Sequence, residues 1–551
     1  MFRHWKITAL FILVGLLCFL FGAKTDEAGI TRTIVEAAEK VSGLQFTGVE
    51  RDSMLGDLVD NLKSYQVLRD IPIENKVPPS LQFNPVPKGK EFETQQKEIV
   101  ISPPRHVEVP DDLEKLAFSS VRDLAELVRT RKITSTQLTR MYLERLKRYG
   151  PRLKCVVTLT EDLALKQARR ADEEIAAGKY RGPLHGIPYG AKDLFAVKGY
   201  RTTWGAMPYK DQIIDEEATI IEKLKKAGAV LVAKLTLGAL AWGDVWYGGM
   251  TRNPWNLEEG SSGSSAGSAS ATAAGLVAFS IGTETWGSIV SPSTRCGTTG
   301  LRPTFGRVSR TGAMALSWSM DKIGPICRTV EDCALVFDAI RGPDDMDQTV
   351  VDLPFNYNPN IDLKGVRIGY LQTLFEEDYP SKETDAATLE KLRELGADLV
   401  AIELPDYPIG DMAFILSAEA AAAFDELTRS GKDDLMVRQI RNAWPNVLRA
   451  SRFIPAVEYI QANRLRYIVI QEMEKIDVDV YVAPSFGGDN LLLTNLTGHP
   501  SVVLPNGFND GGSPVSISFI GKLFDEATLL AVAKMYQDAT DFHEKHPPTF
   551  R

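Results

Sequence analysis

Cysteine is scarce in this chain, which has five cysteines among 551 residues. No two of them form a CxxC pair, and their spacing fits neither a zinc site nor a disulfide framework. Cys18 lies in the N-terminal apolar stretch. We interpret Cys155, Cys296, Cys327 and Cys333 as small buried apolar residues.

Histidine is equally sparse, with six residues in the whole chain. The tail motif 543–546 reads His-Glu-Lys-His, which misses the HExxH zinc motif by one residue and excludes that metalloprotease reading. Only His106, His185 and His499 remain as candidates for histidine-based catalysis. We interpret His185 and His499 as structural, since a glycine or proline follows each.

An excess of basic residues is also absent. Lys and Arg number 63 against 72 Asp and Glu, so the formal net charge is −9. No local basic patch is found, and we predict no nucleic-acid partner. With 25% charged and 44% hydrophobic residues, the composition is that of a globular protein and excludes wholesale disorder.

The N-terminus has the pattern of a targeting segment. Arg3 and Lys6 precede an apolar stretch, residues 7–23, that carries no charge. With seventeen residues, the stretch is intermediate in length between the apolar part of a secretory signal and a short membrane anchor. Residues 1–25 therefore predict either a cleaved signal peptide or membrane anchoring through 7–23. The protein is expected to be exported, periplasmic or extracellular, or anchored facing outward.

Residues 26–114 form a separate N-terminal extension. Residues 26–70 have an amphipathic helical pattern, whereas 71–110 contain eight prolines. Because proline blocks both helices and central strands, the second part is expected to be an extended arm. Such an arm is suited to covering a partner protomer, so a homo-oligomer is left open.

From about residue 115 helical patterns alternate with short apolar runs. Residues 135–149 and 217–228 are typical helices, while 229–234 and 478–483 are typical buried strands. This alternation predicts an α/β fold. We expect a three-layer α/β/α arrangement with a large mixed, mostly parallel central sheet.

A Gly/Ser-rich segment at 259–270, followed by a second Ser/Gly turn at 282–293, is unlike the rest of the chain. A flexible linker is one interpretation. A phosphate loop is another, although neither GxxxxGK[ST] nor GxGxxG is present. Residues 263–267 also match GxSxG, which would make Ser265 a nucleophile, but no strand pattern precedes it. The fourth interpretation is a serine activated by a neutral lysine.

Lys192 is the candidate lysine for this last chemistry. It ends a short strand-like run within the apolar segment 184–195. Burial disfavours the charged ammonium and so lowers the pKa of a lysine. A lysine with a lowered pKa has a neutral amine, which is able to accept a proton.

Several separated motifs resemble those of the amidase signature family of serine amidohydrolases. They are Gly186-Ile187-Pro188 with Lys192-Asp193, then the loop 263–268, the segment 282–292, the stretch 300–309, and 495–500 near the C-terminus. Their order and spacing match those of the family, and the resemblance covers about residues 115–545. It implies an amidase catalytic domain over 115–551.

The resemblance also implies a Ser-Ser-Lys triad. Ser288 would be the nucleophile, Ser264 the bridging serine on a cis peptide bond, and Lys192 the terminal base. The oxyanion hole would consist of the backbone N–H groups of Thr285, Trp286, Gly287 and Ser288. The substrate would be a small-molecule amide, cleaved without a metal or organic cofactor; residues that bind it stay unknown. By the same resemblance Asn495 is a buried position, so its N-x-T sequon would not be glycosylated.

The sequence departs from the family pattern beside the nucleophile. The family pattern here is Asp-x-Gly-Gly-Ser, whereas this chain has Glu284-Thr285-Trp286-Gly287-Ser288, so that Trp286 replaces a glycine. Val290 replaces an arginine, and Ala266 replaces a loop glycine. An indole at 286 is expected to crowd the pocket or to need an unusual φ angle.

Three functions remain after this comparison. The first is an exported hydrolase of carbon–nitrogen bonds in linear amides. The second is the glutaminase (A) subunit of a tRNA-dependent amidotransferase, which has a similar fold but works in the cytosol with partner proteins. The third is a non-catalytic binding protein on the same scaffold.

Overall fold

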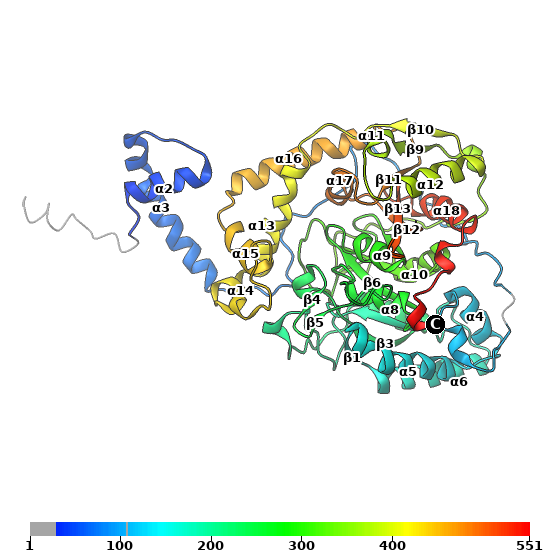
Figure 1. The fold of residues 1–551 in the computed structure, drawn as a ribbon. Helices are drawn as coiled ribbons and strands as arrows, with labels where there is room; N and C mark the ends of the chain where they lie inside the picture. Colours follow the sequence, from blue (N-terminus) through cyan, green and yellow to red (C-terminus); the bar gives the residue numbers. More distant parts are fainter. Residues whose placement is uncertain (1–28, 106–107) are drawn as a thin grey trace, which may run out of the picture. The chain divides into compact units, whose positions relative to one another are not determined.

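The computed structural model describes residues 29–105 and 108–551, so the predicted signal or anchor at 1–25 lies outside the described residues. Within the described part, no helix is long and apolar enough to cross a bilayer. Contacts divide the chain into two units (Figure 1). One comprises the residues up to Val77 together with Phe453–Pro455, and the other comprises Pro78–Arg452 and Ala456–Arg551.

From residue 29 onward, the smaller unit contains two helices, α2 (Arg32–Ser42) and α3 (Gly48–Arg69). The hydroxyl of Thr31 caps α2, and Thr47 forms a capping box with Glu50 at the start of α3. This confirms the helical prediction for the described part of 26–70. The described residues between α3 and Leu113 form neither helix nor strand, as the eight prolines predict. Residues 78–114 belong by contact to the larger unit, and the division into an extension and a catalytic domain stays a prediction.

The larger unit is built on a sheet of eleven strands. In the order in which they lie across the sheet, these are β1 (Val156–Leu159), β3 (Val230–Leu235), β2 (Pro188–Lys192), β6 (Phe279–Glu284), β8 (Lys322–Cys327), β7 (Thr299–Arg302), β12 (Ser501–Phe508), β13 (Pro514–Gly521), β11 (Val480–Pro484), β9 (Ile368–Leu371) and β10 (Leu399–Ile402). A separate two-stranded sheet pairs β4 (Val245–Trp246) with β5 (Gly249–Met250).

Helices pack against this sheet and fill the links between its strands (Figure 1). Helices α5 and α6 contact β3, α8 contacts β6, α10 contacts β8, and α18 contacts β13. The helices are α4 (Val121–Arg129), α5 (Ser135–Leu153), α6 (Glu161–Ala176), α7 (Thr219–Ala227), α8 (Ala266–Ala273), α9 (Val290–Cys296), α10 (Val330–Ile340), α11 (Gln372–Glu376), α12 (Lys382–Glu394), α13 (Phe414–Ala423), α14 (Asp425–Arg429), α15 (Trp444–Ser451), α16 (Ala456–Met473), α17 (Asn490–Thr497) and α18 (Glu526–Asp538).

The α/β fold with a large mixed central sheet is confirmed, but the expected parallel majority is wrong. Among the described strands of this sheet, four pairings are parallel and six are antiparallel. Neighbours such as β12 and β13 are joined by a short turn, which only antiparallel strands allow. Parallel pairs such as β2 and β3 are linked through a helix instead.

Two neighbouring strands in this sheet position the candidate site. Strands β2 and β6 are parallel and fully buried, with Ala191 in register with Ile281. Because parallel strands end at the same edge of a sheet, Lys192 at the end of β2 and Glu284 at the end of β6 come close together there.

Candidate active site

Lys192 is fully buried, with 0% of its surface exposed. Its Nζ donates hydrogen bonds to Ser264 Oγ at 2.8 Å, Ser265 Oγ at 3.0 Å and Thr283 Oγ1 at 2.8 Å. Three hydroxyl partners and no carboxylate in direct contact make this an unusual setting for an ammonium group. Burial lowers the pKa of Lys192 from 10.5 to about 7, against a smaller opposing effect of Asp321 and Glu284. Near neutral pH the amine is therefore able to accept a proton.

The Gly/Ser segment supplies the hydroxyl nearest to this amine. Ser264 is 1% exposed, and the Gly263–Ser264 peptide bond is cis, as the family resemblance implies. The loop enters α8 directly, so neither a flexible linker nor an isolated turn describes it.

Ser265 does not have the setting of a nucleophile. Its hydroxyl donates to Thr283 O at 3.1 Å and accepts from Thr283 N at 3.2 Å as well as from Lys192. No strand is found between β5 and this residue among the described residues, so the strand that a GxSxG elbow requires is missing.

Ser288 lies in the turn that connects β6 to α9 and is 8% exposed. Among the described residues, the backbone N–H groups of 285–288 donate no hydrogen bond, whereas the next two N–H groups do. Four free donors beside a serine are what an oxyanion hole requires. The resemblance assigns the oxyanion hole to these N–H groups of Thr285, Trp286, Gly287 and Ser288, and that assignment stays a prediction.

Trp286 does not have the unusual φ angle that we expected as one outcome. The positive φ in this turn, +82°, belongs to Gly287. The Trp286 side chain is 47% exposed, so a large part of the indole faces solvent.

Glu284 holds this turn in place. One carboxylate oxygen accepts the N–H groups of Ile289 and Val290 at 2.8 and 2.9 Å. The other accepts from Arg302 at 2.8 Å and from Asn495 at 2.9 Å. Burial acts to raise the pKa of Glu284, but Arg302 and these hydrogen bonds bring it to about 2. The carboxylate is thus ionised, and it anchors the residues that immediately follow the candidate nucleophile.

The three residues of the predicted triad are joined only in part. Lys192 is hydrogen-bonded to Ser264, whereas within the described residues no hydrogen bond connects the hydroxyls of Ser264 and Ser288. The loop and the turn meet instead through the backbone, where Ser265 N donates to Ser288 O at 3.1 Å. Catalytic hydrogen bonds are often long before substrate binds, so this geometry does not exclude the relay.

Sequence reasoning missed several residues of this environment. Thr283 contacts the lysine and Arg302 balances the charge of Glu284, while Ser265, considered only as a possible nucleophile, is a hydrogen-bond partner of the lysine instead. A second buried lysine, Lys234, forms an ion pair with Asp193 at 2.8 Å, both with 0% of the side chain exposed. Asp193 was noted only as part of a motif, and no local pattern points to its partner.

The described cysteines, His185 and His499 have buried, structural settings, whereas His106 lies outside the described residues. The four described cysteines are buried free thiols. His185 is 1% exposed beside Glu174, and burial lowers the pKa of His499 to about 3. Asn495 has 0% exposure, as expected. Over 29–105 and 108–551, no group of three or more His, Cys, Asp or Glu side chains has the arrangement of a metal site.

Comparison with known proteins agrees with these observations. The sequence model of the family described as Amidase matches residues 137–491. The chain is 34% identical over 478 residues to the A subunit of the glutamyl-tRNA(Gln) amidotransferase from Methylococcus capsulatus, and the match covers 78% of this chain and 98% of that protein. With the protein of the same name from Acinetobacter baumannii (strain AYE) the identity is 35%, over 79% and 98% of the two chains.

Among solved structures, the native peptide amidase from Stenotrophomonas maltophilia is 31% identical and superposes with a TM-score of 0.70 over 79% of this chain and 99% of that one. The chain therefore belongs to the amidase signature family. It is an enzyme of the class that acts on carbon–nitrogen bonds.

Proposed function

We propose that this enzyme hydrolyses carboxylic amides through an acyl-enzyme formed on Ser288, with Ser264 as the bridging serine and Lys192 as the base. The observation that carries the proposal is the buried amine of Lys192, whose pKa is about 7 and whose Nζ lies 2.8 Å from Ser264 Oγ. A lysine that is neutral at physiological pH activates a serine without histidine.

In the proposed reaction, Lys192 takes the proton of Ser264 while Ser264 takes the proton of Ser288. Ser288 Oγ forms a bond to the amide carbonyl carbon, and the carbonyl electrons move to oxygen. The relay then returns a proton to the leaving nitrogen as the C–N bond breaks. Water attacks the resulting ester by the same route, which releases the carboxylic acid and restores the three residues.

The negative oxygen of the tetrahedral intermediate is proposed to lie at the turn 285–288. The free N–H groups of that turn support this assignment. Each donor is expected to contribute about 3–4 kcal/mol to the transition state, as single oxyanion donors do elsewhere.

The test is labelling by a fluorophosphonate, which reacts with activated serines. The chain should be labelled at Ser288, and the Ser288→Ala variant should lose both labelling and turnover of aryl and alkyl amides. Ser291→Ala, three residues further on, is the matched control and should still be labelled. Labelling of Ser288→Ala at the same rate would refute the assignment. If no serine-directed probe labels the folded protein, the result would favour a non-catalytic binding protein instead.

A second candidate function is the glutaminase component of a tRNA-dependent amidotransferase. The names of the relatives from Methylococcus capsulatus and Acinetobacter baumannii favour it. An amide panel on the purified chain lacking residues 1–25 separates the two candidates. Hydrolysis of simple amides by the chain alone supports the amidase. Glutamine hydrolysis that appears only with added partner proteins supports the amidotransferase.

Export of the protein is also a proposal. It is supported by the uncharged apolar stretch at residues 7–23, which follows Arg3 and Lys6. Fractionation of cells that produce the full chain, with sequencing of the mature N-terminus, tests it. A protein found in the cytoplasm with residues 1–25 intact would contradict it.

A further inference from the structure

Asp321 lies directly across the sheet from the first residue of the nucleophile turn. Strands β6 and β8 are antiparallel, with Glu284 in register with Lys322. Thr285 and Asp321 are the next pair beyond this end of the ladder. Residues directly opposite each other on neighbouring strands lie close enough for their side chains to interact.

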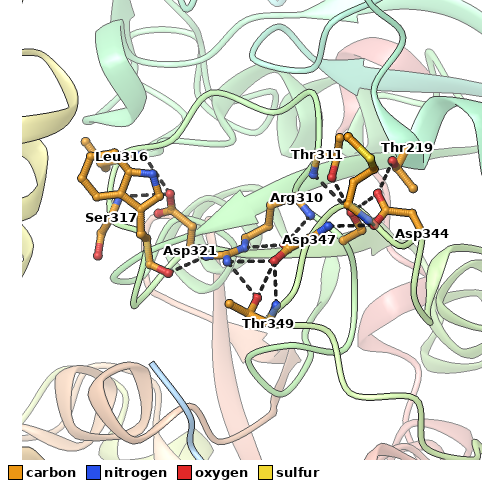
Figure 2. A network of polar contacts seen from close by, with 12 residues as sticks. Thr219, Arg310, Thr311, Leu316, Ser317, Asp321, Asp344, Asp347 and Thr349 are labelled. Carbon is orange, nitrogen blue, oxygen red and sulfur yellow. Dashed lines mark hydrogen bonds and ion pairs between the residues drawn. The ribbon is translucent and has the colours of Figure 1, made fainter. Parts of the chain in front are cut away.

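The two side chains make that contact. Thr285 Oγ1 donates to Asp321 Oδ1 at 2.6 Å, and Thr285 is only 4% exposed. The second carboxylate oxygen accepts the N–H groups of Leu316 and Ser317 at 2.8 and 3.0 Å (Figure 2). Burial raises the pKa of Asp321, and the hydroxyl and N–H groups that donate to its carboxyl group oppose that rise because they favour the charged form.

The loop 316–320 donates two of these hydrogen bonds, and its own position is fixed by contacts with Arg310 and Glu419. Arg310 donates to the carbonyl of Trp318 at 2.6 Å and pairs with Asp347 (Figure 2). The same loop also contacts Glu419 of α13, which accepts from the hydroxyl of Ser317 at 2.7 Å. The carboxyl group of Asp321 is therefore bound to a loop that is itself held by hydrogen bonds. A side chain must be held in this way if it is to orient another group accurately.

We propose that Asp321 is a positioning residue for the amide hydrolysis: through the hydroxyl of Thr285 it fixes the direction of the backbone N–H groups of the turn 285–288. The inference rests on the proposed function, because these N–H groups matter only if an oxyanion forms there. Glu284 holds the far end of the same turn through Ile289 and Val290. The turn with its four free donors is thus held at one end by Asp321, through the hydroxyl of Thr285, and at the other by Glu284, through the backbone N–H groups of Ile289 and Val290.

Asp321 has a second effect that distinguishes it from Thr285. Its charge raises the pKa of Lys192, and Glu284 is the other carboxylate that acts in this direction. Replacement of Asp321 by asparagine removes one of these two charges. The pKa of Lys192 should then fall, so that the base stays neutral at lower pH. Loss of the Thr285 hydroxyl leaves both charges in place.

The first experiment removes the hydroxyl. Thr285→Val keeps the backbone N–H and the side-chain volume but no longer donates to Asp321. We expect kcat to fall by roughly 10- to 100-fold with KM changed less than about threefold, since misdirected donors weaken transition-state binding. The rate of fluorophosphonate labelling should fall in parallel. Thr285→Ser restores the hydroxyl and should recover most of the loss.

The second experiment tests whether Asp321 acts through Thr285. Asp321→Asn should lower kcat by a similar factor, and the double variant should lose little more than either single variant. In a pH profile of kcat/KM, the acidic limb should move to lower pH for Asp321→Asn and stay in place for Thr285→Val. Asp385→Asn, the same chemical change at another buried carboxylate, which accepts from Asn506 away from the turn, should keep its kcat even if its melting temperature falls.

Three outcomes would overturn the inference: wild-type kcat in Thr285→Val, additive losses in the double variant, or losses in Asp321→Asn that only track melting temperature as in Asp385→Asn. These results remain distinct from a failure of the proposed function. In that case the unmodified chain would not be labelled at Ser288, whatever stands at positions 285 and 321.

Discussion

Replacement of Lys192 by methionine should change the stability of the protein more favourably in acid than in alkali. The side chain is fully buried, and burial lowers its pKa from 10.5 to about 7. Below pH 7 both the folded and the unfolded chain carry the ammonium, so the folded state bears the whole cost of burying it. Between pH 7 and 10.5 the unfolded state binds more protons than the folded state, and stability rises with pH.

The two pKa values set the size of the effect. A displacement from 10.5 to about 7 corresponds to roughly 5 kcal/mol, which opposes folding in full below pH 7 and fades as the pH approaches 10.5. Between pH 6 and pH 9 the penalty should shrink by roughly 2.5 kcal/mol. Methionine carries no proton, so Lys192→Met escapes this penalty at every pH. The hydrogen bonds it loses to Ser264 and Thr283 cost about the same at both pH values and cancel in the comparison.

The assay is urea-induced unfolding of both proteins at pH 6 and pH 9. The free energy of unfolding of the variant relative to the unmodified chain should be roughly 2.5 kcal/mol more favourable at pH 6 than at pH 9. Lys179→Met, at an exposed position, is the control, because its ammonium is hydrated in both states. If the free energies of unfolding of the two proteins differ by the same amount at pH 6 and pH 9, the amine at 192 keeps its proton in the folded state. The assignment of Lys192 as the base would then be refuted.

Two further substitutions test the turn that carries Ser288. Glu284→Gln should destabilise the protein by roughly 3–5 kcal/mol, because Arg302 would remain buried without its counter-charge; an unchanged urea midpoint would contradict this. Gly287→Ala places a Cβ 3.2 Å from Leu491 at a φ of +82° and should lower kcat about tenfold, with a smaller change in KM. Gly178→Ala, at a φ of +78° with open space around it, shares the backbone strain but should keep the activity of the unmodified chain.

The elements of the fold could largely be predicted because their signals are local. The helix at 135–149 begins at Ser135 in the structure, after the cap Thr134, and the strand expected at 478–483 is found as β11 at Val480–Pro484. The direction of the strands could not be predicted in the same way. Whether β12 runs antiparallel to β7 depends on a connection of nearly two hundred residues, and no local pattern encodes it.

The same distinction between local and long-range information applies to the candidate site. Lys192, Ser264 and Ser288 could be named because each stands in a motif of its own. The partners that give them chemical character come from distant segments, such as Arg302 for Glu284 and Asp321 for Thr285. The proximity of such groups follows from strand order, and a single sequence does not reveal that order.

Trp286 shows how a departure from a family pattern depends on backbone conformation. A glycine at 286 would be indispensable only if that residue had a positive φ, but the left-handed residue of this turn is Gly287. Position 286 is therefore free to carry a side chain, and its indole projects partly into solvent without removing an N–H group from the turn. The substitution consequently leaves the backbone N–H groups of the turn 285–288 in place, and its effect should fall on which substrates bind beside Ser288. A Trp286→Gly variant should then change KM across a panel of amides of different size more than it changes kcat.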